Sequence, residues 1–198
     1  MSVNTYLTSD EQSRLERATI GIAGAGGLGS NVAAHLVRAG VRRLVIADFD
    51  VISPSNLNRQ FFFRDQIGRR KVDALAENLR RIEPDLDLSP HAVRIDAANL
   101  RTIFGECDIV VEAFDNVESK AALLAALRDK LVVSASGLAG WGRSNEMKIR
   151  RLGKNLVLVG DCASDIRAGL APQSARVGIA AAMQANAVLA LLLGADEL

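Results

Sequence analysis

The stretch Thr19-Ile-Gly-Ile-Ala-Gly-Ala-Gly-Gly-Leu-Gly29 decides the fold. Its first half is apolar, which predicts a buried strand over residues 19–24 that runs into a glycine loop. The second half, Gly24-Ala-Gly26-Gly27-Leu-Gly29, leads into an amphipathic segment that predicts a helix over residues 27–39, ended by Gly40. A glycine loop between a strand and a helix is typical of nucleotide binding. The backbone can approach a phosphate or ribose without Cβ collisions, and the first N–H groups of the helix face the anion.

Further apolar runs and amphipathic segments alternate downstream of this loop. Strands are predicted at residues 43–48, about 88–95, 108–114 and 131–136, and helices at 70–82, near 97–104, and at 117–128. Strict alternation of this kind places helices on both faces of a mostly parallel sheet. We therefore predict a Rossmann-like, doubly wound α/β fold.

The pattern changes after residue 136. Residues 145–151 and 155–159 predict an antiparallel hairpin that extends the sheet. Residues 161–174 form a loop long enough to suggest a function. The last segment, residues 175–193, is almost uniformly apolar, but Arg176, Gln184 and Asn186 interrupt it, which favours a buried closing helix over a membrane span.

Length and composition narrow the class of protein. The chain has 198 residues and a formal net charge of +1. We expect one domain over residues 1–198 and no nucleic-acid or membrane partner. The first 15 residues are polar and lack the apolar core of a secretory signal, and two cysteines cannot form a disulfide framework, so we expect a cytoplasmic protein.

Asp48 adds to the nucleotide signal. It ends the second predicted strand, where a carboxylate can accept both ribose hydroxyls of a bound nucleotide. The alternative is a purely structural glycine turn. Loop and acid together indicate an adenine nucleotide, but they do not distinguish NAD from ATP.

Three further features favour ATP. Ser55-Asn56-Leu-Asn58-Arg59-Gln60 is a polar loop in which the planar guanidinium of Arg59 suits phosphate oxygens. Lys71 lies at the start of the helix predicted from about residue 70, where a cation is disfavoured unless an anion lies nearby, whereas Arg69 and Arg70 fit a solvated face. Asp115-Asn116 follows the fourth predicted strand, so Asp115 either holds Mg²⁺ against phosphates or caps the next helix.

Together with the glycine loop, the segments Asp48-Phe-Asp50, Ser55–Gln60, Lys71 and Asp115-Asn116 resemble the ThiF/MoeB/HesA family, the bacterial relatives of ubiquitin-activating enzymes. The short length and the Val177-Gly-Ile-Ala-Ala-Ala182 segment are most similar to the short ThiF branch assigned to thiamine biosynthesis. The resemblance implies ATP- and Mg²⁺-dependent adenylation of the C-terminal Gly-Gly carboxylate of a ubiquitin-like sulfur carrier, ThiS, with release of pyrophosphate.

Roles follow from the same resemblance, position by position. Gly24, Gly26, Gly27 and Gly29 form the nucleotide loop, and Asp48 binds the ribose. Ser55, Asn56, Asn58 and Arg59 line the phosphate side, Lys71 meets the phosphates, and Asp115 positions Mg²⁺ beside Asn116. Arg59, Lys71 and Asp115 would carry the chemistry, since an ionised carboxylate attacking ATP needs alignment and charge neutralisation rather than a protein nucleophile.

The chain departs from longer members of the family in its cysteines. It lacks their two Cys-x-x-Cys pairs, so no structural zinc is expected. We expect Cys107 to be a small core residue and Cys162 to have no catalytic role. The resemblance implies a homodimer in which a partner arginine can join the site. Arg14 and Arg17 lie in the right region, but we expect them to be solvated on an N-terminal helix. Trp141 is a hypothetical cover for the carrier's tail.

Other functions remain possible on the residues alone. They are an NAD-dependent oxidoreductase, a family member acting on a molybdopterin-type carrier or a modified tRNA base, and a non-catalytic scaffold. The near-zero net charge argues against RNA. The absence of a substrate domain argues against the oxidoreductase.

Overall fold

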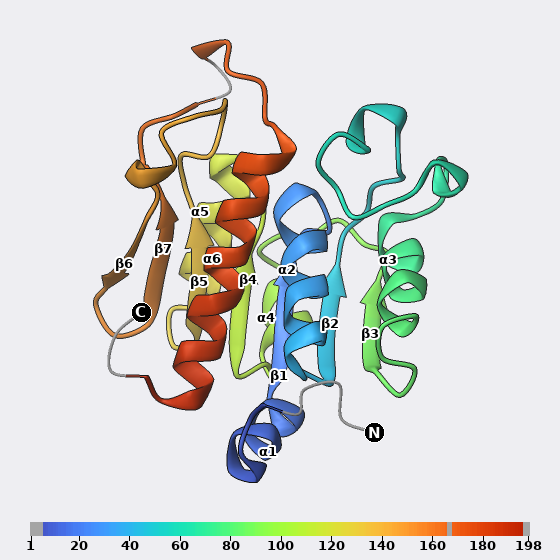
Figure 1. Ribbon diagram of the computed structural model, residues 1–198, viewed down its shortest axis with the longest axis vertical. Coiled ribbons are helices and arrows are strands. Elements are labelled where there is room, and N and C mark those ends of the chain that lie inside the picture. The colour runs from blue at the N-terminus through green and yellow to red at the C-terminus, as the bar shows by residue number, and fades with distance from the viewer. Residues whose placement is uncertain (1–5, 166–167, 196–198) are drawn as a thin grey trace.

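The computed structural model describes residues 6–165 and 168–195 and contains one seven-stranded sheet (Figure 1). The strand order is β3-β2-β1-β4-β5-β7-β6, and all neighbours are parallel except β6 and β7. The strands are β1 (Thr19–Ala23), β2 (Arg43–Ala47), β3 (Asp87–His91), β4 (Ile109–Glu112), β5 (Leu131–Ala135), β6 (Lys148–Leu152) and β7 (Leu156–Gly160). The Rossmann-like fold and its antiparallel C-terminal hairpin are confirmed.

Helices cover both faces of the sheet. In Figure 1, α2 and α6 cross the near face and α4 and α5 lie behind the strands. One core packs under α2, α3 and α6, and a second, smaller core packs under α4 and α5. The helices are α1 (Ser9–Arg17), α2 (Gly27–Ala39), α3 (Lys71–Arg80), α4 (Leu100–Phe104), α5 (Val117–Ala126) and α6 (Ser174–Leu193).

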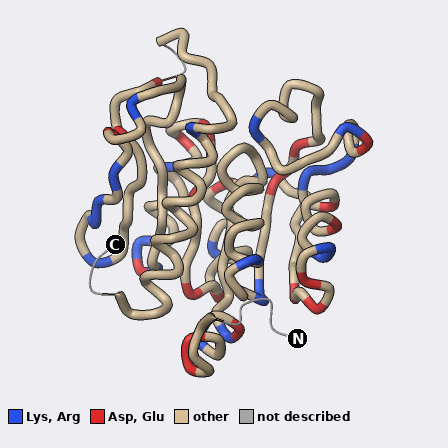
Figure 2. The backbone as a smooth tube through the Cα atoms, viewed as in Figure 1, with Lys and Arg blue, Asp and Glu red and all other residues tan. Residues whose placement is uncertain are grey.

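Helix α6 is the longest and most apolar helix among the described residues. It has the length and mean hydropathy of a membrane span, yet eight of its residues are buried and it packs along α2. Figure 2 shows that α6 carries charge only near its first turn, which holds Arg176. The prediction of a buried closing helix is therefore correct for the face that α6 turns toward the sheet.

The third strand is shorter than predicted, and the reason bears on the site. It ends at His91, whose carbonyl oxygen accepts a hydrogen bond from the Asp48 N–H group (3.1 Å). The chain then crosses the carboxyl edge of the sheet, where Val93 and Arg94 line a cleft. The apolar side chains of Val93 and Ile95 thus belong to the cleft wall and not to a longer strand.

The strand order places β1 at the topological switch point. The chain leaves β1 toward β2 on one side, and β4 pairs with β1 on the other. The loops after β1 and β4 therefore diverge and leave a crevice at the carboxyl ends of the strands, where doubly wound folds bind ligands.

Candidate nucleotide-binding site

A cleft of about 930 Å³ occupies this crevice. Its walls come from five parts of the chain: the glycine loop, the segment from Asp48 to Lys71, the segment after β3, the β4–α5 turn, and residues 135–139 after β5. The wall is completed by Ser164 and Asp165, which follow β7, and by Pro172 and Val177 at the start of α6. The size suits a nucleotide, because small-molecule sites commonly span about 300–1,000 Å³.

The glycine loop is built for close contact between backbones. Gly24 has a φ of +104°, and a Cβ added there would lie 2.9 Å from the Ala113 carbonyl oxygen. A Cβ at Gly29 would lie 1.8 Å from the Gly24 carbonyl oxygen. Gly29 therefore lets α2 pack on the loop and does not itself line the cleft, whereas Gly24, Gly26 and Gly27 do. Gly26 caps α2 without a side chain, which leaves the helix N-terminus open to an anion.

Asp48 joins the glycine loop to β2. Its Oδ2 accepts a hydrogen bond from the Ala25 N–H (2.7 Å) and its Oδ1 accepts one from the Asp50 N–H (2.8 Å). Each carboxylate oxygen retains a lone pair, and the side chain lines the cleft. Asp48 thus orients the loop and keeps the capacity to accept ribose hydroxyls.

The loop that carries Arg59 is fastened to α2. Ser30 Oγ accepts the Phe61 N–H (3.0 Å), and the Asn31 amide donates to the Arg59 carbonyl oxygen (2.9 Å). Arg59 lies against Gly27 and lines the cleft with Asn56. Ser55 and Asn58 are not among the cleft-lining residues: Ser55 pairs with Ser53, and Asn58 contacts Arg59 and the Pro172 carbonyl oxygen.

Lys71 is the first residue of α3 and lines the cleft. Its side chain is only 7% exposed, and its Nζ donates to Asp50 Oδ2 at 2.6 Å, whereas the Asp50 side chain is 46% exposed. The cation is therefore held in the wall by a carboxylate that faces solvent. Arg69 instead pairs with Glu77 on an exposed face, as expected for a solvated residue.

The structure of the β4–α5 turn excludes one of the two roles that the sequence left open for Asp115, which were holding Mg²⁺ and capping the next helix. Asn116, not Asp115, caps α5, since its Oδ1 accepts the Ser119 N–H at 2.8 Å. Asp115 is exposed and lines the cleft, and Asn116 lines it too. The capping alternative for Asp115 is therefore wrong.

The donor set fits magnesium in the manner of ATP-dependent enzymes. Within residues 6–165 and 168–195, no group of three or more His, Cys, Asp or Glu side chains is placed to hold a metal. Mg²⁺ in such sites is commonly held by one or two carboxylates, substrate phosphates and water. The exposed Asp115 carboxylate, which lines the same cleft as Lys71 and Arg59, can supply the protein ligand.

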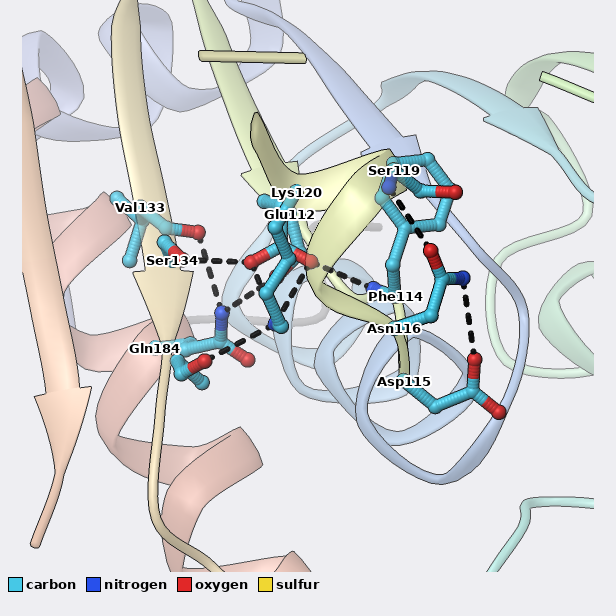
Figure 3. A network of polar contacts seen from close by, with 10 residues as sticks. Glu112, Phe114, Asp115, Asn116, Ser119, Lys120, Val133, Ser134 and Gln184 are labelled. Atoms are coloured by element: carbon cyan, nitrogen blue, oxygen red, sulfur yellow. Dashed lines mark hydrogen bonds and ion pairs between the residues drawn. The ribbon is translucent and has the colours of Figure 1, made fainter. Parts of the chain in front are cut away.

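Sequence reasoning missed three residues that line the cleft, Gln60, Arg94 and Lys120, and it missed Glu112, which is buried outside the cleft lining. Gln60 is buried in the wall, and its Oε1 has no hydrogen-bond partner among the described residues. The guanidinium of Arg94 lies 5.4 Å from the Phe49 ring centroid beside Asp48. Glu112 is fully buried at the end of β4 and binds Lys120, which also lines the cleft (Figure 3). The sequence did contain a signal for Glu112, because this residue is an acid that ends an otherwise apolar strand.

Cys107 is buried, as expected of a small core residue, while Cys162 is exposed and the expectation that it has no catalytic role stays a prediction. Burial raises the pKa of the Cys107 thiol to about 11, so it behaves as a core residue. Cys162 is exposed at a φ of +60°, with the Arg150 guanidinium 3.5 Å from its sulfur. Trp141 is 74% exposed beyond residues 135–139 and does not line the cleft, so its role in covering a tail stays a prediction.

Comparison with known proteins identifies the family. The model of the ThiF family matches residues 2–198. The chain belongs to the ThiF family. Molybdopterin-synthase adenylyltransferase of Escherichia coli (strain K12) is 36% identical over 131 residues, which is 66% of this chain and 53% of that protein. Ubiquitin-like modifier-activating enzyme 5 of Drosophila persimilis is 36% identical over 129 residues, 59% of this chain and 34% of that protein.

Solved structures of the family share the fold. The tRNA N6-threonylcarbamoyladenosine dehydratase TcdA of E. coli, solved in complex with AMP, superposes with a TM-score of 0.86 at 20% identity, over 94% of this chain and 90% of that one. The two curated relatives are longer, and the chain spans about a third to a half of their length. Family and fold are therefore settled, while the activity of this chain is a separate question.

Proposed function

We propose that the protein adenylates the C-terminal carboxylate of a ubiquitin-like carrier protein with ATP and releases pyrophosphate. The observation that carries this proposal is the convergence of the glycine loop, Arg59, Lys71 and Asp115 on one cleft at the switch point. The names of the relatives, which include adenylyltransferases and a modifier-activating enzyme, support it. Membership of this family also favours ATP over NAD as the nucleotide.

The reaction suits a site without a nucleophilic side chain. A carboxylate oxygen of the carrier forms a bond to the α-phosphorus of ATP, and the bond from that phosphorus to the oxygen between the α- and β-phosphates breaks, so pyrophosphate leaves with that oxygen. The attacking group is already ionised, so the site must align two anions and neutralise the charge that grows on the leaving group. Arg59 and Lys71 supply positive charge, and Asp115 would hold Mg²⁺, which when bound neutralises phosphate charge.

We further propose a ThiS-like carrier and hence a place in thiamine (thiazole) biosynthesis. The support is the likeness of the Glu112-Ala-Phe-Asp-Asn116 and Val177–Ala182 segments to the short ThiF branch. A homodimer, supported by the apolar residues that α6 leaves half-buried, and a cytoplasmic location belong to the same proposal. A molybdopterin-type carrier is the matched competitor, to be offered to the protein in the same assay.

ATP–pyrophosphate exchange tests the proposal. Purified protein is assayed with ThiS-like and molybdopterin-type carriers, each ending in a free Gly-Gly. Arg59→Ala and Asp115→Ala should each lower exchange by about 10²–10³-fold, the effect of removing one preorganised charge-stabilising contact. Arg69→Ala is the control, because Arg69 lies on the same stretch of chain but pairs with Glu77 outside the cleft. Equal loss in all three variants, or exchange without any carrier, contradicts the proposal.

A further inference from the structure

A buried polar network lies beneath the cleft, where β4 and β5 end (Figure 3). At its centre is Glu112, whose side chain is 0% exposed. Lys120 Nζ donates to both carboxylate oxygens (2.9 and 2.7 Å), Ser134 Oγ donates to Oε2 (2.5 Å), and the Phe114 N–H donates to Oε1 (2.7 Å). Gln184 of α6 lies against the same strand ends. The carboxylate is thus satisfied by groups from three elements.

Stability alone does not explain such a network. Taking the Glu112 carboxylate out of water costs free energy, and apolar side chains of similar volume often serve a core equally well or better. The surrounding core is apolar, with Leu123, Phe104 and Val132 among its members. Core packing alone therefore does not account for a buried glutamate in this position.

The network closes a gap between two strands. β4 and β5 pair in parallel only as far as Val111 and Val133. Beyond that point, Lys120 Nζ also donates to the Ala135 carbonyl oxygen (3.0 Å). The Gln184 amide donates to the carbonyl oxygens of Glu112 and Val133 (both 3.1 Å). Side chains therefore hold together two strand ends that backbone hydrogen bonds no longer join.

Each strand end continues directly into a different wall of the cleft. β4 leads into the turn that carries Asp115, and β5 leads into residues 135–139. Glu112 fixes the first wall through the Phe114 N–H and the second through Lys120 and Ser134. We propose that Glu112 is a positioning residue for adenylation: it sets the placement of the Asp115 turn relative to the wall after β5. This inference rests on the function proposed above and assigns a role to a residue that does not line the cleft.

The variant Glu112→Gln tests it, because glutamine has the same shape but no charge to hold Lys120. ATP affinity without Mg²⁺ should stay within about twofold, since the glycine loop and Asp48 are untouched. The gain in ATP affinity on adding Mg²⁺ should fall several-fold, as in Asp115→Asn, because the displaced turn presents Asp115 poorly. Carrier-dependent exchange should fall by about 10²-fold in kcat, the scale expected for a misplacement of about 1 Å.

A charge-neutral pair separates positioning from folding. Glu112→Gln combined with Lys120→Met removes both charges, so the melting temperature should recover toward the wild-type value while exchange stays slow. Recovery of both melting temperature and exchange would overturn the inference, because the network would then serve stability only.

Double-mutant cycles give a second check. In the first cycle, the effects of Glu112→Gln and Asp115→Asn on exchange should be less than additive, because both act through the Asp115 carboxylate. In the second cycle, the effects of Glu112→Gln and Arg59→Ala on exchange should be additive. The Mg²⁺-dependent gain in ATP affinity is measured without any carrier, so it tests the inference even if the carrier is misassigned. A wild-type gain in Glu112→Gln overturns the inference, whereas absence of exchange in the wild-type protein overturns the proposed function.

Discussion

Two lysine–carboxylate pairs flank the cleft and are built in opposite ways. In the pair after β2, Lys71 is 7% exposed and Asp50 is 46% exposed, with 2.6 Å between Nζ and Oδ2. In the pair after β4, Lys120 is 24% exposed and Glu112 is 0% exposed, with 2.7 Å between Nζ and Oε2. Similar pairs of charges at strand ends therefore differ in which partner faces the solvent.

The exposure of the carboxylate determines whether its lysine can bind a ligand. Lys71 can take a phosphate oxygen as a second partner. Breaking its ion pair with Asp50 costs little free energy, because the Asp50 carboxylate is exposed to solvent. A lysine whose partner is buried cannot release it without leaving a charge in the core. We therefore read Lys71 as a ligand-facing cation and Lys120 as part of the frame.

The largest expected effect on stability comes from Lys120→Met. The change leaves the Glu112 carboxylate buried without a cation and should lower the free energy of unfolding by about 3–5 kcal/mol. For a chain of this size that corresponds to a fall in melting temperature of roughly 6–20 °C. Urea denaturation followed by circular dichroism measures it, and a loss below about 1 kcal/mol would mean that the pair is not buried in solution.

Lys71→Met should give the opposite signature. Exchange should fall by about 10²–10³-fold, because one charge-neutralising contact to the phosphates is lost. The free energy of unfolding should change by less than about 1 kcal/mol, since Asp50 is left at an exposed position. Exchange kinetics and urea denaturation, measured on the same preparation of Lys71→Met, test these two expectations. A variant that is destabilised as strongly as Lys120→Met would erase the contrast between the two pairs.

A third ion pair, Asp161–Arg176, extends the comparison to a pair with both partners buried. Burial alone would raise the pKa of Asp161, but hydrogen bonds from Ser164, Ala163 and Arg176 outweigh it and hold the pKa below the ordinary value of 3.8. The stabilisation is therefore complete above pH 3.8 and is lost as the pH falls through the lower folded-state pKa. Unfolding free energies measured from pH 6 to pH 2 should fall less steeply for Asp161→Asn, and parallel curves would refute the assignment.

The smallest effect is expected at an exposed pair. Arg69 and Glu77 are each about half exposed, at 43% and 51%, and lie outside the cleft. Arg69→Ala should leave both the melting temperature and exchange unchanged within error, because solvent screens such pairs. A clear loss of exchange would show that the ligand extends beyond the cleft described here.

The sequence predicted the features that depend on residues close together in the chain. Helix α2 was predicted to the residue, because it starts after the glycine loop and ends at Gly40, which adopts a φ of +107°. Four predicted site residues line the cleft, and each lies in a recognisable motif next to a strand end: Asp48, Arg59, Lys71 and Asp115. Ser55 and Asn58 share the Arg59 motif, but neighbours in sequence need not face the same way, and these two point elsewhere.

The network around Glu112 could not be predicted in this way. Its members are far apart in sequence, and only the end of β4–β5 pairing brings Glu112, Ser134 and Gln184 together. The sequence shows each as a polar residue inside an apolar run, which signals an unusual position but not its partners. Tertiary packing supplies that information.

Carrier adenylation can be tested by ATP–pyrophosphate exchange with one ThiS-like carrier, either intact or lacking its terminal glycine. We predict exchange with the intact carrier and none with the shortened one, because the free terminal carboxylate must reach the α-phosphorus. Exchange that does not depend on the carrier, or no exchange with either ThiS-like or molybdopterin-type carriers despite measured ATP binding, would contradict it.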